Sequence, residues 1–124
     1  MKSCWETHRD VRFFHFDISS FGLDDAGIIQ EIDDADAIIM EEPLNSVLVL
    51  NDVRDSVGSM KVIQHLEVSA ERSTPYIKRA AVVGVTGAKR ILLEVVNRFS
   101  RRPIVAFDDL EKAKDWLVTE PAIN

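Results

Sequence analysis

The side chains that could perform chemistry are few and far apart in this sequence of 124 residues. None of the three histidines, His8, His15 and His65, has a second histidine or a carboxylate at the spacing by which one helix holds a metal ion. The single cysteine, Cys4, excludes an internal disulfide framework and a multi-cysteine zinc site. Neither a GxSxG elbow nor a GxGxxG or GxxxxGKS/T phosphate loop occurs. The sequence therefore predicts a protein that is not an enzyme and that holds no metal and no cofactor.

Carboxylates are abundant, but their expected surroundings do not suit catalysis. Pairs stand at 24–25, 33–34 and 41–42, in a stretch of nineteen residues with eight carboxylates and no base. On the polar face of a helix such carboxylates are solvated, whereas general acid–base catalysis needs a carboxyl group in a dry pocket. We likewise expect His15 on the solvated face of a strand and His65 on the outer face of a helix.

Hydrophobic periodicity predicts four strands and four helices that alternate. The strands are expected at 11–18, 46–51, 79–85 and 104–107, and the helices at 23–42, 57–72, 88–99 and from Asp108 toward Pro121. Strict alternation in the first strand indicates one buried face, and the apolar runs of the next two indicate strands covered on both faces. Apolar residues at steps of three and four mark the helices. Asp108, three residues before Glu111, forms a capping-box pattern for the last helix.

This order of elements, β-α-β-α-β-α-β-α, is typical of an α/β layered fold. We expect a mainly parallel sheet of four to five strands flanked by about four helices. The length fits one domain, residues 1–124. Residues 1–10 precede the first strong strand and form either an extra edge strand or a loose terminus.

Charge and composition exclude several classes of protein. The net charge of −6 argues against nucleic-acid binding, which depends on Lys and Arg at phosphates. No apolar run is long enough to cross a bilayer, and the first residues lack the apolar core of a signal peptide, so we expect a cytoplasmic protein. Residues 1–62 carry a net −8 and residues 63–124 a net +2. These halves are either solvated faces or patches that dock, within a homodimer or on a protein partner.

Polar residues follow the ends of three expected parallel strands, where open α/β sheets bind their ligands. Unpaired amides at the helix starts there could hold an anion. Ordinary helix capping is the alternative for Thr86 and Asp108. The predicted ligand or partner loop comprises Asp52, Asp55, Ser56, Thr86, Gly87, Phe107 and Asp108.

Four stretches of the sequence carry a resemblance to a known family. They read FHFDIS at 14–19, NSVLVLNDV at 45–53, PYIKRAAVVGVTG at 75–87, and AFD at 106–108 followed by AKDWL at 113–117. In this order they resemble the small bacterial SpoIIAA-like, or STAS-like, family, which is related in fold to anti-sigma-factor antagonists and more distantly to CRAL-TRIO lipid-binding domains. The resemblance implies a SpoIIAA-like fold.

The resemblance also implies a regulatory serine. In the antagonists, a serine in an Asp-Ser-Ser-Gly-like loop is phosphorylated and switches partner binding. Here the matching residues are Asp55-Ser56-Val57-Gly58, so Ser56 is the candidate phosphosite. Two departures count against it: Val57 replaces the second serine, and residues 52–54 lengthen the loop.

Two functions follow as expectations. The first is a non-enzymatic regulatory or protein-interaction module that binds a protein partner or associates with itself. The alternative is a binder of a small anionic or amphipathic, lipid-like or nucleotide-like, ligand at the C-terminal edge of the strands, near Asp52, Ser56, Thr86 and Phe107.

Overall fold

Five strands form one sheet in the computed structural model, which describes residues 1–55, 59–85, 90, 93–94, 97–98 and 104–119. Their order across the sheet follows the chain: β1 (Cys4–His8), β2 (Val11–Asp17), β3 (Val47–Asp52), β4 (Ile77–Val83) and β5 (Val105–Phe107). β1 pairs with β2 in an antiparallel manner, and the pairs β2–β3, β3–β4 and β4–β5 are parallel. The mainly parallel α/β sheet expected from the sequence is thus confirmed.

The N-terminal residues form an edge strand that is joined to β2 by a two-residue turn. Both residues of the turn, Arg9 and Asp10, have positive φ angles of 51° and 66°, as a type I′ hairpin turn requires. The ring of Trp5 lies edge-on to Phe14 with centroids 5.1 Å apart. The guanidinium of Arg12 covers the Trp5 ring at 3.7 Å. These contacts attach β1 to the rest of the sheet.

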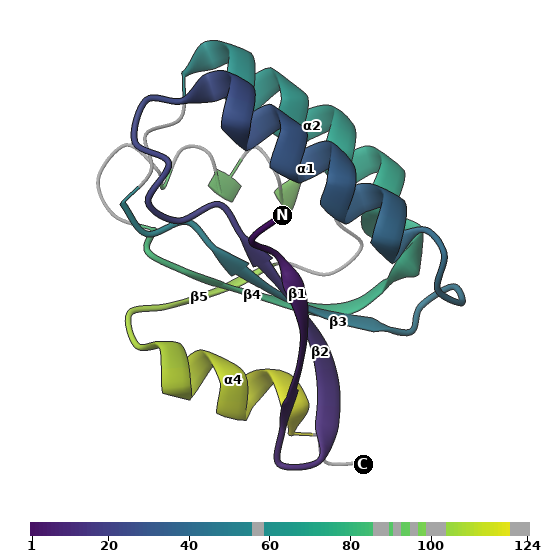
Figure 1. The fold of residues 1–124 in the computed structure, drawn as a ribbon. Coiled ribbons are helices and arrows are strands. Elements are labelled where there is room, and N and C mark those ends of the chain that lie inside the picture. Colours follow the sequence, from purple (N-terminus) through teal and green to yellow (C-terminus); the bar gives the residue numbers. More distant parts are fainter. Residues whose placement is uncertain (56–58, 86–89, 91–92, 95–96, 99–103, 120–124) are drawn as a thin grey trace.

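Helices cover both faces of the sheet (Figure 1). α1 (Asp25–Ile39) and α2 (Met60–Ser73) pack side by side on one face, and α4 (Leu110–Val118) lies on the other. A short 3-10 helix, η1 (Thr74–Tyr76), links α2 to β4. The helix expected at 88–99 lies largely outside the described residues. Within that range, residues 90, 93, 94 and 97 are described as helical.

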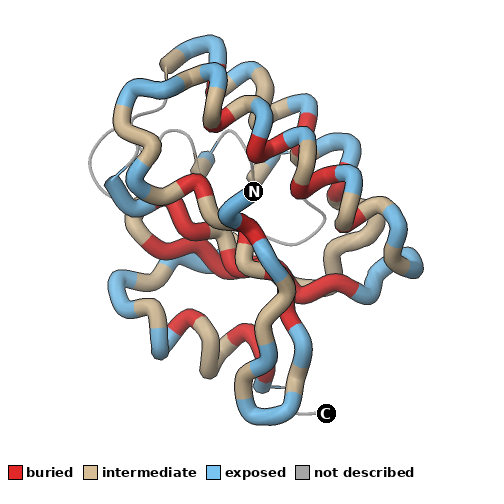
Figure 2. Tube along the Cα trace, in the orientation of Figure 1, coloured by how far each residue is buried: buried red, intermediate tan, exposed pale blue. Residues whose placement is uncertain are grey.

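Each side of the sheet has its own apolar core (Figure 2). Phe14, Phe16 and Ile18 belong to the core beneath α1 and α2. Phe13 and Leu50 belong to the second core, beneath α4. Because consecutive strand residues point to opposite faces, adjacent Phe13 and Phe14 are both fully buried. The prediction of one buried face for this strand was therefore incomplete, since α4 covers the second face.

Short polar side chains cap the starts of α1, α2 and α4, and one of these caps differs from the prediction. The side chains of Asp24 and Ser59 accept hydrogen bonds from backbone amides in the first turns of α1 and α2. The predicted cap of the last helix, Asp108, was wrong. The N-cap of α4 is Asp109, whose side chain accepts from the amide of Glu111 at 2.9 Å.

Candidate functional site

The four described residues of the predicted loop lie at or just after the carboxyl ends of β3 and β5, the two strands that flank β4. Asp52 is the last residue of β3, and its side chain is 0% exposed. Asp55 lies exposed in the following loop with a φ of 54°. Phe107 packs against Trp116 of α4 with ring centroids 5.6 Å apart, and Asp108 is exposed just after it.

The other three predicted residues, Ser56, Thr86 and Gly87, lie outside the described residues. Among the described residues, no hydrogen bond or ion pair joins any two of Asp52, Asp55 and Asp108. The site predicted from these seven residues stays a prediction.

A histidine that the sequence analysis placed in solvent lies at the centre of a charged cluster. His15 of β2 is 12% exposed. Its Nδ1 lies 2.5 Å from Oε2 of Glu6 on β1, and its Nε2 lies 3.0 Å from Oδ2 of Asp52 on β3. Arg54 donates to both oxygens of Asp52, from Nε at 2.8 Å and Nη2 at 2.7 Å. The prediction of a solvated His15 was wrong, because strands on either side supply a carboxylate to each ring nitrogen.

The geometry of this cluster favours a protonated histidine. A neutral imidazole has one N–H to donate, whereas the imidazolium has two. Burial works to lower the pKa of His15, but its hydrogen bonds to Asp52 and Glu6 outweigh burial and raise that pKa. Burial likewise works to raise the pKa of Asp52, but the bonds from His15 and Arg54 hold it well below its usual range. Each partner therefore stabilises the charged form of the other.

The same cluster contains the atoms with which a divalent cation could be bound. Ligand atoms of His15, Asp17 and Asp52 all lie within 4.8 Å of one another. Each carboxylate nevertheless has a cationic neighbour, since Arg54 binds Asp52 and Nζ of Lys2 lies 3.6 Å from Asp17. A further double positive charge would compete with these groups. The donor set suits a proton on His15 better than it suits a metal ion.

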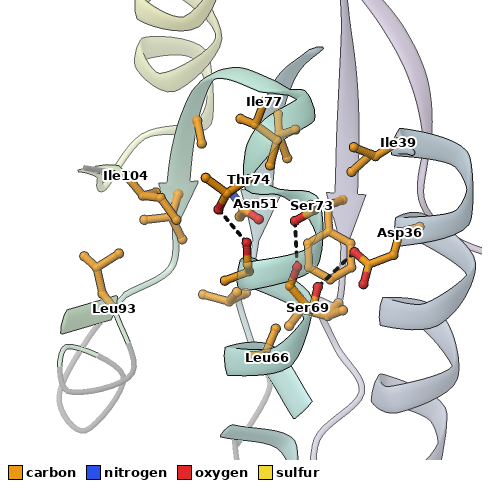
Figure 3. Close-up of a pocket in the computed structure, with 18 of the residues that line it drawn as sticks. Asp36, Ile39, Asn51, Leu66, Ser69, Ser73, Thr74, Ile77, Leu93 and Ile104 are labelled. Carbon is orange, nitrogen blue, oxygen red and sulfur yellow. Dashed lines mark hydrogen bonds between the residues drawn. The ribbon is translucent and has the colours of Figure 1, made fainter. Parts of the chain in front are cut away.

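A cavity of about 120 Å³ lies on the other side of the sheet, beneath α1 and α2 (Figure 3). Among the described residues, its floor is formed by β2, β3 and β4, and its walls by the inner faces of the two helices together with Val85, Leu93 and Ile104. The apolar side chains that line it include Phe16, Ile18, Ala35, Ile39, Val49, Val53, Leu66, Ala70, Ile77, Val82, Leu93 and Ile104.

Asp36, Ser69 and Ser73, at the wall of the cavity, are bonded to other protein groups. Buried Asp36 accepts from Ser69 at 2.8 Å and from Arg72 at 2.6 Å. Ser73 donates to the carbonyl of Ser69 at 2.8 Å. Burial raises the pKa of Asp36, although the bonds from Arg72 and Ser69 act to lower it. The cavity is therefore an apolar chamber with a carboxylate bonded to protein donors at its wall.

The cavity does not coincide with the predicted loop. None of Asp52, Asp55, Phe107 and Asp108 is among the residues that line it. The residues that line the cavity lie on the apolar faces of the strands and helices, which periodicity predicts to form the core. Periodicity identifies which residues face the core, but it does not tell whether their volumes fill the space between the layers.

The fold and the cavity define an α/β domain in which a small apolar cavity lies between the helices and a five-stranded sheet. No protein-family model and no curated protein sequence matches the chain. A solved structure does: an uncharacterised protein from the DUF3478 family with a SpoIIAA-like fold, from Shewanella loihica PV-4.

That protein shares 18% sequence identity with the chain, with a TM-score of 0.73 over 93% of this chain and 91% of the other. At such identity the likeness concerns the fold alone, and it shows that the chain has a SpoIIAA-like fold. This confirms the resemblance drawn from the sequence. Among the described residues, no helix is both long enough and apolar enough to span a membrane.

Proposed function

We propose that this chain is a non-enzymatic binding domain of the STAS-like type, and that its cavity holds a small, largely apolar molecule. The observation that carries the proposal is the apolar space of about 120 Å³ between the sheet and the two helices. Protein interiors are normally packed as tightly as organic crystals, so a space of this size in a natural core needs a cause.

The size of the cavity supports a ligand of about one aromatic ring. An engineered apolar cavity of about 150 Å³ binds benzene. A ligand that fills the space would remove the apolar side chains around it from water, which is worth about 25 cal/mol per Å² of apolar area buried.

The surroundings of Cys4 support a binding role over a catalytic one. Burial raises the pKa of the Cys4 thiol, and the nearby carboxylates of Glu6 and Asp17 raise it further. A raised thiol pKa disfavours the thiolate that would act as a nucleophile.

Filling the cavity tests the proposal. Ala70 of α2 lines the cavity, and Ala70→Leu adds three carbon atoms there, whereas Ala37→Leu makes the same change on the exposed side of α1. We expect toluene to raise the melting temperature of the wild type and of Ala37→Leu, because a ligand of the native state stabilises it. The rise should be absent in Ala70→Leu. An equal response of all three proteins, or no response of the wild type, would contradict the proposal.

A surface feature favours protein interaction as a second function. Leu23, before α1, is 81% exposed, and Met60, the first residue of α2, is 67% exposed. Ser59 donates to Asp25 at 2.7 Å, which holds the starts of α1 and α2 together. The two apolar side chains therefore lie at the same end of the helical layer.

Different variants test self-association and its control by Ser56. Sedimentation velocity of the wild type should show a dimer that Leu23→Ser with Met60→Ser dissociates, while Leu44→Ser with Val68→Ser, at other exposed apolar positions, leaves it intact. If Ser56 is a phosphosite, Ser56→Asp should change the dimer fraction. A monomer at all concentrations would refute self-association through this end.

A further inference from the structure

One polar side chain stands on the apolar floor of the cavity. Asn51 of β3 faces the helices between Val49 and Val53, both of which are buried in the core on that side. Its neighbours across the sheet in register are Phe16 of β2 and Val82 of β4. Figure 3 shows Asn51 between the strands and the end of α2. An amide at this place costs free energy unless its polar atoms are bonded.

The hydrogen bond that Asn51 makes leaves its carbonyl oxygen available. Nδ2 donates to the backbone carbonyl of Ala81 at 3.0 Å, which fixes the orientation of the amide group. In the described part of the structure no donor to Oδ1 is found. The floor of the cavity thus presents a hydrogen-bond acceptor to whatever fills it.

The hydroxyl groups around the cavity are directed to protein acceptors. Ser69 donates to Asp36, Ser73 to the carbonyl of Ser69, and Thr74 to the carbonyl of Ala70. An anionic ligand would therefore lie beside the carboxylate of Asp36 without a donor from these hydroxyls. Two cationic residues also border the cavity, but Lys78 has an interaction partner of its own, and the guanidinium of Arg79 lies over Trp116 of α4 and donates to the carbonyl of Thr119.

We propose that the ligand is an uncharged apolar molecule that donates one hydrogen bond to Oδ1 of Asn51, such as a small phenol, alcohol or indole. This inference rests on the proposed function, because it names the ligand chemistry of the same cavity. It concerns another place than the anionic or amphipathic ligand expected at the C-terminal edge of the strands, which stays a prediction. The cavity volume of about 120 Å³ limits the enclosed part of the ligand to about one ring.

Three ligands of similar shape test this chemistry by ¹H–¹⁵N correlation spectra during titration at pH 7. Phenol donates a hydrogen bond, fluorobenzene has no hydrogen to donate, and benzoate is an anion. We expect phenol and fluorobenzene to shift the amide signals of cavity residues, and benzoate to bind at least tenfold more weakly than phenol. Phenol, but not fluorobenzene, should also shift the side-chain amide signals of Asn51, a result that needs no variant.

Asn51→Leu removes the acceptor while it preserves the shape of the side chain. A buried hydroxyl without a hydrogen-bond partner weakens binding. Phenol should therefore bind the variant at least about tenfold more weakly than the wild type, while the affinity for fluorobenzene stays within about twofold. Gln64→Leu replaces an amide on the exposed side of α2 and should change neither affinity. Lys78→Gln should likewise leave phenol binding unchanged.

The outcomes separate this inference from the proposed function. If neither phenol nor fluorobenzene binds, the cavity takes no ligand and both fail. Fluorobenzene binding shows that the cavity takes ligands. If phenol then binds the wild type and Asn51→Leu with equal affinity, or if phenol does not bind, the role of Asn51 is refuted. Benzoate binding that is tighter than phenol binding and is lost in Lys78→Gln would overturn the inference in favour of an anionic ligand.

Discussion

Removing the carboxylate of Asp52 is the sharpest perturbation of the charged cluster. Its fully buried side chain receives a bond from His15 at 3.0 Å and two from Arg54 at 2.7 and 2.8 Å. Loss of one partner of a buried ion pair costs about 3–5 kcal/mol. Arg54 is 47% exposed and can return to water, so we expect Asp52→Asn to lower the free energy of unfolding by about 3 kcal/mol at pH 5.5.

The interaction between His15 and Asp52 should depend on pH in both directions. The pKa of His15 is raised from 6.5, so its contribution to stability is complete below 6.5 and is lost as the pH rises through the raised value. The pKa of Asp52 is lowered from 3.8, so its contribution is complete above 3.8 and is lost as the pH falls through the lowered value. The coupling should therefore be largest between these two ordinary values.

A double-mutant cycle in urea measures this coupling. The cycle combines His15→Gln with Asp52→Asn at several pH values from 5 to 9, and we expect a coupling of about 2 kcal/mol at pH 5.5 that shrinks as the pH rises. The same cycle on His65 and Asp33, whose Nε2 and Oδ1 lie 2.7 Å apart, is the control. Asp33 is exposed, so its coupling should be smaller. A coupling for the His15 pair that is no larger than the control, or is constant over this pH range, would refute the reasoning.

Three further predictions concern stability measured by chemical denaturation. Asp109→Ala should cost about 1 kcal/mol because it removes the N-cap of α4, whereas Asp108→Ala should cost much less. Gly84 has a φ of 96°, and a Cβ there would lie 2.7 Å from the backbone nitrogen of Arg54. Gly22 has a φ of 58°, but a Cβ there would meet open space. Gly22→Ala should therefore cost about 1 kcal/mol of stability, and Gly84→Ala should cost more. Leu117→Ala, in the fully buried core beneath α4, should cost about 3–4 kcal/mol. Equal losses of stability in Asp109→Ala and Asp108→Ala would contradict the N-cap of α4, and equal losses in Gly84→Ala and Gly22→Ala would contradict the close contact at Gly84.

The fold followed from the sequence because its signals are local. Alternation in FHFDI and the apolar run VLVL are properties of a few adjacent residues, and they correspond to β2 and β3 as the structure has them. The cap of α4 was misplaced by one residue because Asp108 and Asp109 offer the same side chain. Which of the two adopts the extended backbone of an N-cap depends on how β5 leads into the helix.

The charged cluster could not be predicted from spacing, because its members come from three strands. Glu6 and His15 are nine residues apart, and His15 and Asp52 are 37 apart. Placing them together requires the register of β1 on β2 and of β2 on β3. Asp52 was named as a candidate because it follows a buried strand, but its partner His15 was assigned to solvent from alternation alone.

The sequential order of the strands has a consequence for where a molecule binds in this domain. Crevices at the ends of parallel strands form in other sheets where two successive crossovers diverge to opposite faces. Here the crossovers through α1 and α2 both run over the same face, so no such divergence occurs between β2 and β4. A molecule bound in this domain therefore lies between the helical layer and the sheet, beside β2, β3 and β4, and not in a crevice at the strand ends.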